Sequence, residues 1–222
     1  MTLLYTAMAV PLLVAVPVLV AVLLSQRVRG LALFRTVFYL PSVLSGVAVA
    51  MLWVWLLNPR FGVINFLLGL VGIPGPGWLA DEHWALPALV LMSVWGMGNW
   101  IVINLAALQG VPAELREQAT VDGANAVQRF RHVVLPMISP VILFNAVIAA
   151  IASFQTFTQA FIMTAGGPNK ATYFYNLYLY EKAFRSLQMG MASAMAWILF
   201  VLIMLSTALL FWVARGRVYY AG

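Results

Sequence analysis

The first 26 residues, MTLLYTAMAVPLLVAVPVLVAVLLSQ (1–26), contain no lysine, arginine, aspartate or glutamate, and the run ends only at Arg27. A transmembrane helix needs about 20 apolar residues, at a rise of about 1.5 Å per residue, to cross about 30 Å of hydrocarbon. Pro11 and Pro17 do not oppose a helix here, because membrane helices tolerate proline as a kink. The stretch therefore predicts a membrane-spanning helix.

The rest of the chain repeats this pattern. Of its 222 residues, 64% are apolar and 8% are charged, whereas soluble domains carry about 25% charged residues. The runs lack the alternation of a barrel strand, so we expect helices to satisfy their backbone hydrogen bonds in lipid. We predict one all-α integral membrane domain over residues 1–222, with five transmembrane helices at 1–26, between Arg35 and Arg60, and at 84–108, 137–164 and 190–214.

One further apolar stretch, FGVINFLLGLVG (61–72), is too short to span a bilayer. Its residues Phe61, Ile64, Leu68 and Val71 have the spacing of one helical stripe. We interpret the stretch as an interfacial or re-entrant helix in preference to a sixth crossing.

The basic residues indicate the topology. With five crossings, the connectors 27–35 and 109–136 and the C-terminal tail share one side of the membrane, which then holds eight basic residues. Four lie on the other side. The positive-inside rule makes the richer side cytoplasmic and places the N-terminus outside. The net charge of +6 is thus a topological signal, and it gives no reason to expect a nucleic-acid partner.

An outside N-terminus with no basic residue before its span is a poor start for insertion. It indicates that a preceding helix is missing from this sequence or that an unusual insertion route is used. A signal peptide over 1–26 is a less favoured alternative, because the basic n-region is absent and the run is too long.

Several kinds of chemistry are disfavoured. The chain has no cysteine, and His83 and His132 are predicted on opposite sides of the membrane, so we expect no metal site. The segment from Asp122 to Arg129 resembles the start of a membrane alcohol-phosphotransferase site, but six acids in the whole chain are too few for such a metal cluster. No phosphate-binding loop is present, so we expect no enzyme activity and an external source of energy.

The longest cytoplasmic connector, residues 110–136, is called the elbow here. A short helix is expected from Pro112, and Gly123 is expected to end it in a left-handed conformation. Asp122 or Asn125 can cap a second helix, over about 125–134, that leads into the fourth span. The result is a helix–turn–helix at the membrane surface.

The elbow sequence resembles the E-A-A-x3-G-x9-I-x-L-P signature of membrane subunits of binding-protein-dependent ATP-binding cassette importers. Gln118 replaces the usual second alanine, and Val133 replaces the usual isoleucine. Gln118 keeps helix propensity but puts the detailed packing against a partner in doubt. The matching residues are Glu117, Ala119, Gly123, Leu135 and Pro136.

A second motif narrows the resemblance. TAGGPNKAT (164–172) is similar to the T-x-G-G-P-x-x-x-T of sugar-type permeases, those for maltose, other oligosaccharides and glycerol phosphate. Taken physically, the same residues also suffice as a simple turn between helices. Members of this group usually carry one more helix upstream, so the resemblance implies a six-helix core that lacks its first helix here. Other stretches that look like this group are FGVIN (61–65), AALQGVPAELREQA (106–119) and YLYEKAF (178–184).

The resemblance implies a permease that works with other proteins in a bacterial or archaeal cytoplasmic membrane. Its implied partners are membrane lipid, a second homologous permease, two cytoplasmic ATPases and an external solute-binding protein. ATP and Mg would be bound by the ATPases, and this chain would hold no cofactor. The residues expected to couple the elbow to an ATPase are Arg116, Glu117, Ala119, Asp122, Gly123 and Ala124.

Polar and aromatic side chains at membrane depth are candidates for a solute pathway, because unpaired polar groups avoid hydrocarbon. Trp95 and Asn99 are expected to share a helical face at i, i+4, and Ser153, Thr156 and Phe157 another at i, i+3, i+4. Their neutral, aromatic character suits a sugar, and the same residue types also join membrane helices. A glycerol phosphate or other small polar solute, or a passive channel or structural subunit, remains the alternative function.

Overall fold

The computed structural model describes residues 1–26, 30–216 and 218, and within these residues every regular element is a helix. Three helices are each long and apolar enough to cross a membrane. Two bent pairs bring the number of candidate spans to as many as five. The elements are α1 (Thr2–Ser25), α2 (Leu31–Val43), α3 (Gly46–Leu56), α4 (Val63–Leu70), α5 (Glu82–Trp95), α6 (Gly98–Gln109), α7 (Ala113–Val121), α8 (Ala126–Arg129), the π-helical turn η1 (Phe130–Val134), α9 (Leu135–Phe154), α10 (Thr158–Met163), α11 (Tyr175–Tyr180), the π-helical turn η2 (Glu181–Arg185) and α12 (Met189–Ala214).

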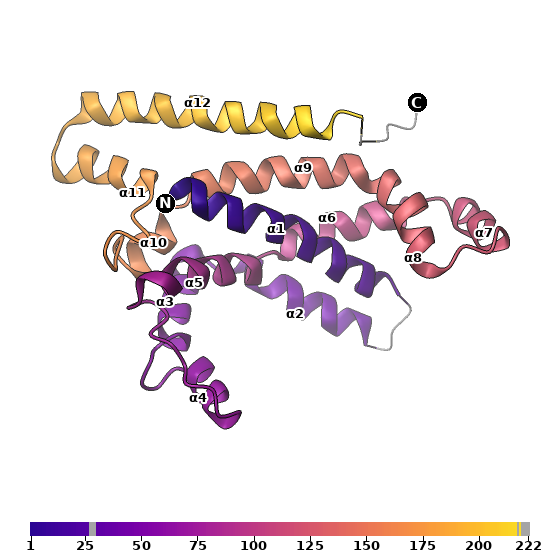
Figure 1. Ribbon diagram of the computed structural model, residues 1–222, viewed down its shortest axis with the longest axis horizontal. Coiled ribbons are helices and arrows are strands. Elements are labelled where there is room, and N and C mark those ends of the chain that lie inside the picture. Colours follow the sequence, from indigo (N-terminus) through magenta and orange to yellow (C-terminus); the bar gives the residue numbers. More distant parts are fainter. Residues whose placement is uncertain (27–29, 217, 219–222) are drawn as a thin grey trace.

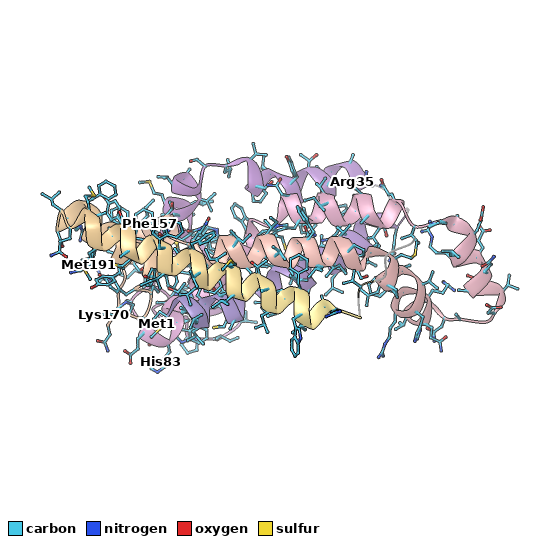
Figure 2. All side chains as sticks on the ribbon, turned by 90° about the horizontal axis from the view of Figure 1, so that it is seen from above. Met1, Arg35, His83, Phe157, Lys170 and Met191 are labelled. Atoms are coloured by element: carbon cyan, nitrogen blue, oxygen red, sulfur yellow. The ribbon has the colours of Figure 1, made fainter. Side chains whose placement is uncertain are left out.

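Helix α1 lies at the centre of the bundle. It packs against α5, α6 and α9, while α12 packs on the other side of α9 and is largely exposed (Figure 1). The elbow helices α7 and α8 lie at one end of the molecule, and the N-terminus lies toward the other. Figure 2 likewise shows Met1, His83, Lys170 and Met191 gathered far from the elbow, with Arg35 in the half nearer to it. The predicted first and fifth spans are confirmed as α1 and α12.

The second predicted span is not one straight helix. It consists of α2 and α3, which meet at an angle of 105°. Leu44 and Ser45 adopt extended backbone angles between them, and the Ser45 hydroxyl accepts a hydrogen bond from the Ala48 backbone N–H at 3.3 Å. The side chain of Ser45 thus caps a new helix, which explains why the chain breaks here in spite of its continuous apolarity.

The third predicted span is also bent, by 48° between α5 and α6. The bend falls at Gly96 and Met97. Directly after it, Gly98 lies against the backbone of α2, where an added Cβ would stand 2.8 Å from the Phe38 carbonyl oxygen. A glycine is therefore needed for α6 to approach α2 this closely.

The fourth predicted span, 137–164, is wrong at its far end. Helix α9 ends at Phe154, residues 155–157 leave the helix, and α10 is a separate short helix. The Gln155 carbonyl oxygen accepts a hydrogen bond from the Asn176 side chain at 2.9 Å. At its other end, α9 continues through η1 into α8, so that Ala126–Phe154 forms one 29-residue helix.

The stretch 61–72 forms a short helix, as predicted, and Figure 1 shows α4 extending away from the bundle. The predicted stripe is wrong, because Phe61 and Val71 lie outside the helix and are exposed, whereas Ile64 and Leu68 are half-buried. The reason is that the helix begins only at Val63, after Gly62.

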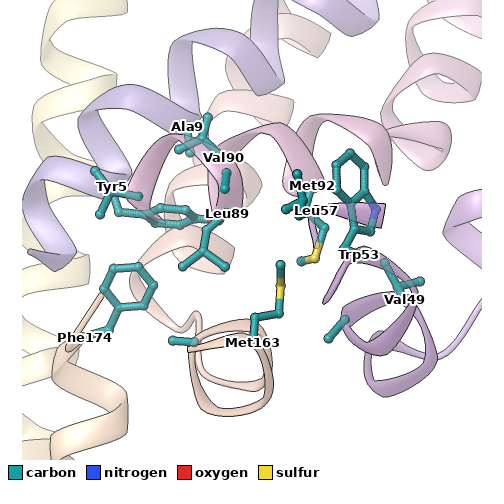
Figure 3. Packing of buried hydrophobic residues seen from close by; sticks show 14 of the residues in the cluster. Tyr5, Ala9, Val49, Trp53, Leu57, Leu89, Val90, Met92, Met163 and Phe174 are labelled. Atoms are coloured by element: carbon teal, nitrogen blue, oxygen red, sulfur yellow. The ribbon is translucent and has the colours of Figure 1, made fainter. Parts of the chain in front are cut away.

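Two apolar clusters hold the bundle together. The first joins α1, α3, α5 and the segment around Phe174, whose ring lies 4.9 Å from that of Tyr5 (Figure 3). The second joins the elbow-side halves of α1, α6 and α9 around Ile101 and Ile138. Fully buried Ala9 and Ala149 belong to the first cluster and Ala21 to the second, and such small residues let membrane helices approach closely.

Candidate functional site

The elbow has the turn that its sequence predicts. Gly123 adopts φ = +81°, the left-handed conformation that glycine accepts without strain. No atom lies within 4 Å of the position of a Cβ at Gly123, so the backbone angle and not crowding requires glycine. The backbone N–H of Ala124 donates to the Ala119 carbonyl oxygen at 2.9 Å and closes the end of α7.

The second elbow helix is capped by Asn125, one of the two residues that the sequence offered. The Asn125 side chain accepts from the Gln128 backbone N–H at 2.9 Å, and the Gln128 side chain accepts from the Asn125 backbone N–H at 2.8 Å. This reciprocal pair is a capping box. Asp122 instead forms the end of α7, and Arg129 donates to the Ala124 carbonyl oxygen at 2.8 Å. The turn between α7 and α8 is thus fixed from both sides.

The coupling residues predicted from the sequence lie together on this elbow. Glu117, Asp122 and Gly123 are exposed, and Ala119 and Ala124 are partly exposed. Two shallow hollows flank Asp122, and one of them carries Glu114 and Glu117 as well. The hollow with Glu114 and Glu117 is acidic, whereas the other also carries Arg129 and His132.

Arg116 differs from the other predicted coupling residues. Its guanidinium donates to the Val111 carbonyl oxygen at 3.3 Å, so the side chain points back toward the end of α6 and orients α7. Val121, which the sequence did not single out, is 88% exposed at the end of α7. An apolar residue within the most polar run of the chain was the signal that could have revealed it.

A central cavity of about 250 Å³ lies where the broken helices meet. The α2–α3 break, the α5–α6 bend and the end of α9 all contribute to its wall. None of the described side chains that line it carries a charge. The lining residues are Tyr5, Leu13, Pro41, Ser42, Leu44, Gly46, Val49, Met92, Ser93, Gly96, Trp100, Ala152, Ser153, Thr156 and Gln159.

Two of the five predicted pathway residues, Ser153 and Thr156, line this cavity. Ser153 is only 2% exposed, and its hydroxyl has no hydrogen-bond partner in the described part of the chain. Thr156 donates to the Ala152 carbonyl oxygen at 3.2 Å. A buried hydroxyl without a partner is unfavourable unless something else binds it, which makes Ser153 the clearest polar contact that the cavity offers.

The other three predicted pathway residues lie outside the cavity lining. Trp95 packs edge-on against Trp53, with ring centroids 5.9 Å apart, and Asn99 is exposed on α6. The expectation that these two share one helical face is wrong, because α5 ends at Trp95 and the bend separates them.

Phe157 also departs from the expected face. It follows the end of α9 and stacks on Phe161 at 5.3 Å, with Tyr180 at 4.9 Å from its ring. The prediction that Phe157 shares a helical face with Ser153 and Thr156 is therefore wrong, since the helix does not continue past Phe154.

Sequence reasoning did not select the polar residues that distant segments bring to the cavity. Ser93 donates to the Leu89 carbonyl oxygen at 2.9 Å, so the Tyr5 hydroxyl donates to Ser93 across a 2.5 Å contact. Ser42 comes from α2, beside the break. Polar side chains in otherwise apolar spans were the available signal, but the sequence does not indicate which of them converge.

The described residues contain no group of three or more histidine, aspartate or glutamate side chains that could hold a metal ion. A surface elbow joined to a spanning helix, and a cavity where helices are broken, are features that membrane transporters use.

The comparisons identify the family. Residues 1–218 match the family of binding-protein-dependent transport system inner membrane components, and the chain belongs to it. It is therefore a multi-pass inner-membrane permease. It is 44% identical over 220 residues to the probable ABC transporter permease protein YesP of Bacillus subtilis, covering 97% of this chain and 71% of the relative.

Two further similarities agree. The lactose transport system permease protein LacF of Rhizobium radiobacter is 30% identical over 223 residues, covering 97% of this chain and 74% of the relative. The crystal structure of a bacterial ABC transporter that imports the acidic polysaccharide alginate matches with a TM-score of 0.85 and 24% identity, over 96% of this chain and 76% of that one. The structural match shows that the fold is shared.

Proposed function

We propose that this permease translocates a neutral sugar or oligosaccharide through a pathway that includes the central cavity. The observation that carries the proposal is the buried Ser153 hydroxyl, which has no hydrogen-bond partner among the described residues, in a cavity lined by hydroxyl, amide and aromatic groups. Sugars present hydroxyls for such groups and apolar ring faces for Tyr5 and Trp100.

The names of relatives support a sugar. They include LacF, the multiple sugar-binding transport system permease MsmF of Streptococcus mutans, and the arabinooligosaccharide permease AraP of Halalkalibacterium halodurans. A phosphorylated solute is less favoured, because none of the side chains that the structure places in the cavity wall is cationic. The acidic solute of the alginate importer is a property of that protein.

We further propose that the elbow is the docking helix for a cytoplasmic ATPase, which would bind ATP and Mg. Support comes from the exposed acidic surface at Glu114, Glu117 and Asp122 and from the continuous helix that joins α8 to α9. Movement of the elbow would reach the cavity, because α9 ends beside Ser153. The basic connectors support a cytoplasmic position for this end of the molecule.

The other partners are a second permease and an external solute-binding protein. A partly open cavity of about 250 Å³ is at the small end for a ligand site, so a facing subunit would complete the pathway. One structural relative was solved with a pentasaccharide-bound periplasmic protein, which supports delivery from outside. The proposed location is the cytoplasmic membrane of a bacterium or archaeon.

Solute uptake by the complete transporter in proteoliposomes tests the pathway. Ser153→Trp should abolish or redirect uptake of the transported sugar while the ATPase still assembles, because the indole fills the cavity. Ile148→Trp is the matched control, since it lies on the exposed side of the same helix. Unchanged uptake and selectivity in Ser153→Trp would remove the cavity from the pathway.

Isolation of the membrane protein with its soluble partners separates this function from a passive channel or structural subunit. A transporter subunit should recover an ATPase through the elbow, and Glu117→Lys should reduce that recovery. A chain that mediates solute flux without any ATPase would favour the channel.

A further inference from the structure

Helix α4 presents an apolar stripe to its surroundings. It extends away from the bundle at the end opposite the elbow (Figure 1). The stripe consists of Val63, Phe66, Leu67 and Leu70, which are all exposed and have the spacing i, i+3, i+4, i+7 of one helical face. A helix facing water would place polar residues at these positions.

The single polar residue of α4, Asn65, is turned inward and satisfied within its own loop. Its amide donates to the Pro76 carbonyl oxygen at 3.1 Å and to the Pro59 carbonyl oxygen at 3.4 Å. Its side-chain oxygen accepts from the Trp78 indole N–H at 2.6 Å. We call these contacts the Asn65 clasp. They hold the segments before and after α4, at Pro59 and at residues 76–78, against the helix. The outer stripe of α4 is left without a side-chain donor or acceptor.

The charged residues on either side of the loop 61–80 indicate how deeply this loop can enter the membrane. Exposed Arg60 precedes it and exposed Asp81, Glu82 and His83 follow it, while residues 61–80 contain no charged side chain. Eight helical residues extend about 12 Å, well short of the roughly 30 Å needed for a crossing. The chain thus leaves and returns to water on the same side of the bilayer.

Trp78 and Trp84 mark the boundary itself. Their rings pack edge to face, with centroids 5.1 Å apart, between the Asn65 clasp and the start of α5. Tryptophan is enriched at the interface between lipid headgroups and acyl chains.

We propose that α4 is a lipid anchor, which lies along the bilayer boundary with Val63, Phe66, Leu67 and Leu70 among the acyl chains. Protein interfaces carry about one hydrogen bond per 100–200 Å² and a polar rim, and the stripe offers neither. Acyl chains need no such partners. The tryptophan pair and the charged residues on both sides of the loop place the stripe at the boundary of the bilayer. The anchor does not depend on which solute is carried.

The absence of cysteine allows a direct test. A nitroxide is attached to Leu70→Cys in the assembled transporter, in vesicles of phosphatidylcholine and phosphatidylglycerol. Its collision rates with lipid-soluble oxygen and with a water-soluble nickel chelate are then compared. His83→Cys is the control, because it is exposed on the charged flank of the same loop. We expect the oxygen-to-nickel ratio to be several-fold higher at Leu70 than at His83.

Two results would overturn the anchor. Protection of the Leu70 label from both reagents would mean that a protein subunit covers the stripe, and strong exposure to nickel would place it in water. Sugar uptake is measured in the same vesicles, so a failed anchor is distinguished from a failed transport function.

Two alanine substitutions test the Asn65 clasp. At Gly75 an added Cβ would stand 2.2 Å from the Asn65 side chain, whereas at Gly69 it meets nothing within 4 Å. Gly75→Ala should therefore raise nickel accessibility of the Leu70 label several-fold, and Gly69→Ala should not. Equal nickel accessibility of the Leu70 label in the two variants would show that the clasp does not orient the helix.

Discussion

At the scale of single residues, the elbow depends on one backbone angle. Gly123 needs φ = +81°, which costs a residue with a side chain about 1–2 kcal/mol, although asparagine tolerates it better. The space around the missing Cβ is open, so a substitution there changes the backbone preference and little else.

A series of substitutions at Gly123 tests whether the elbow needs this left-handed backbone angle. We expect Gly123→Asn to keep most solute uptake, Gly123→Ala to lose part of it and Gly123→Val to lose most, with ATP hydrolysis no longer matched to uptake. Uptake and hydrolysis are measured on the same proteoliposomes. Gly190→Ala is the control, because Gly190 lies in the first turn of α12 with open space around it. Equal uptake across the Gly123 series would show that the left-handed turn is dispensable.

A second pair of glycines tests the close approach of α2 and α6. Gly98→Ala would place a Cβ 2.8 Å from the Phe38 carbonyl oxygen, whereas at Gly96 the nearest atom is at an ordinary 3.6 Å. We expect Gly98→Ala to lower the melting temperature in detergent by several degrees, in line with about 1–3 kcal/mol of overpacking. Gly96→Ala should change it much less. A similar melting temperature for both variants would mean that α2 moves away without cost.

At the scale of elements, the chain is built from helices that end inside the membrane domain as well as at its surfaces. Hydropathy alone predicts α1 and α12, because a single unbroken run decides each of them. It does not separate α2 from α3, since the break at Ser45 lies within an equally apolar sequence. The end of α9 was missed for the same reason. The elbow was predicted in more detail, because turn and cap residues act locally.

The capping box gives an element-scale prediction. Asn125→Ala removes an N-cap that contributes about 1 kcal/mol, so amides of Ala126–Arg129 should exchange hydrogen faster. Asp122→Ala should leave that exchange unchanged, because Asp122 ends α7 and does not cap α8. Hydrogen exchange followed by mass spectrometry measures both variants. Faster exchange of α8 in Asp122→Ala alone would reverse the assignment of the cap.

At the scale of the whole molecule, the candidate site forms where residues from distant parts of the chain meet. No local sequence pattern indicates which residues these are. Tyr5, Ser93 and Ser153 are far apart in the chain, and only the packing of α1 against α5 and α9 brings them to one cavity. The sequence identified Ser153 and Thr156 as polar residues at membrane depth. It misplaced Trp95 and Phe157, because it assumed straight helices through both breaks.

The same arrangement joins the elbow and the cavity through one continuous helix. Val127 and Phe144 are exposed on the unbroken segment Ala126–Phe154, 17 residues apart, which corresponds to about 25 Å. If this segment moves as a rigid body during transport, the distance between nitroxides at these two positions stays constant in nucleotide-free and ATP-bound transporter. The distance from Val127 to Met51 on α3 should change, because α3 is a separate helix that begins after the break at Ser45. Pulsed electron spin resonance on double-cysteine variants measures both distances. A change between Val127 and Phe144 would instead place the moving hinge at the π-helical turn η1, between the elbow and the cavity.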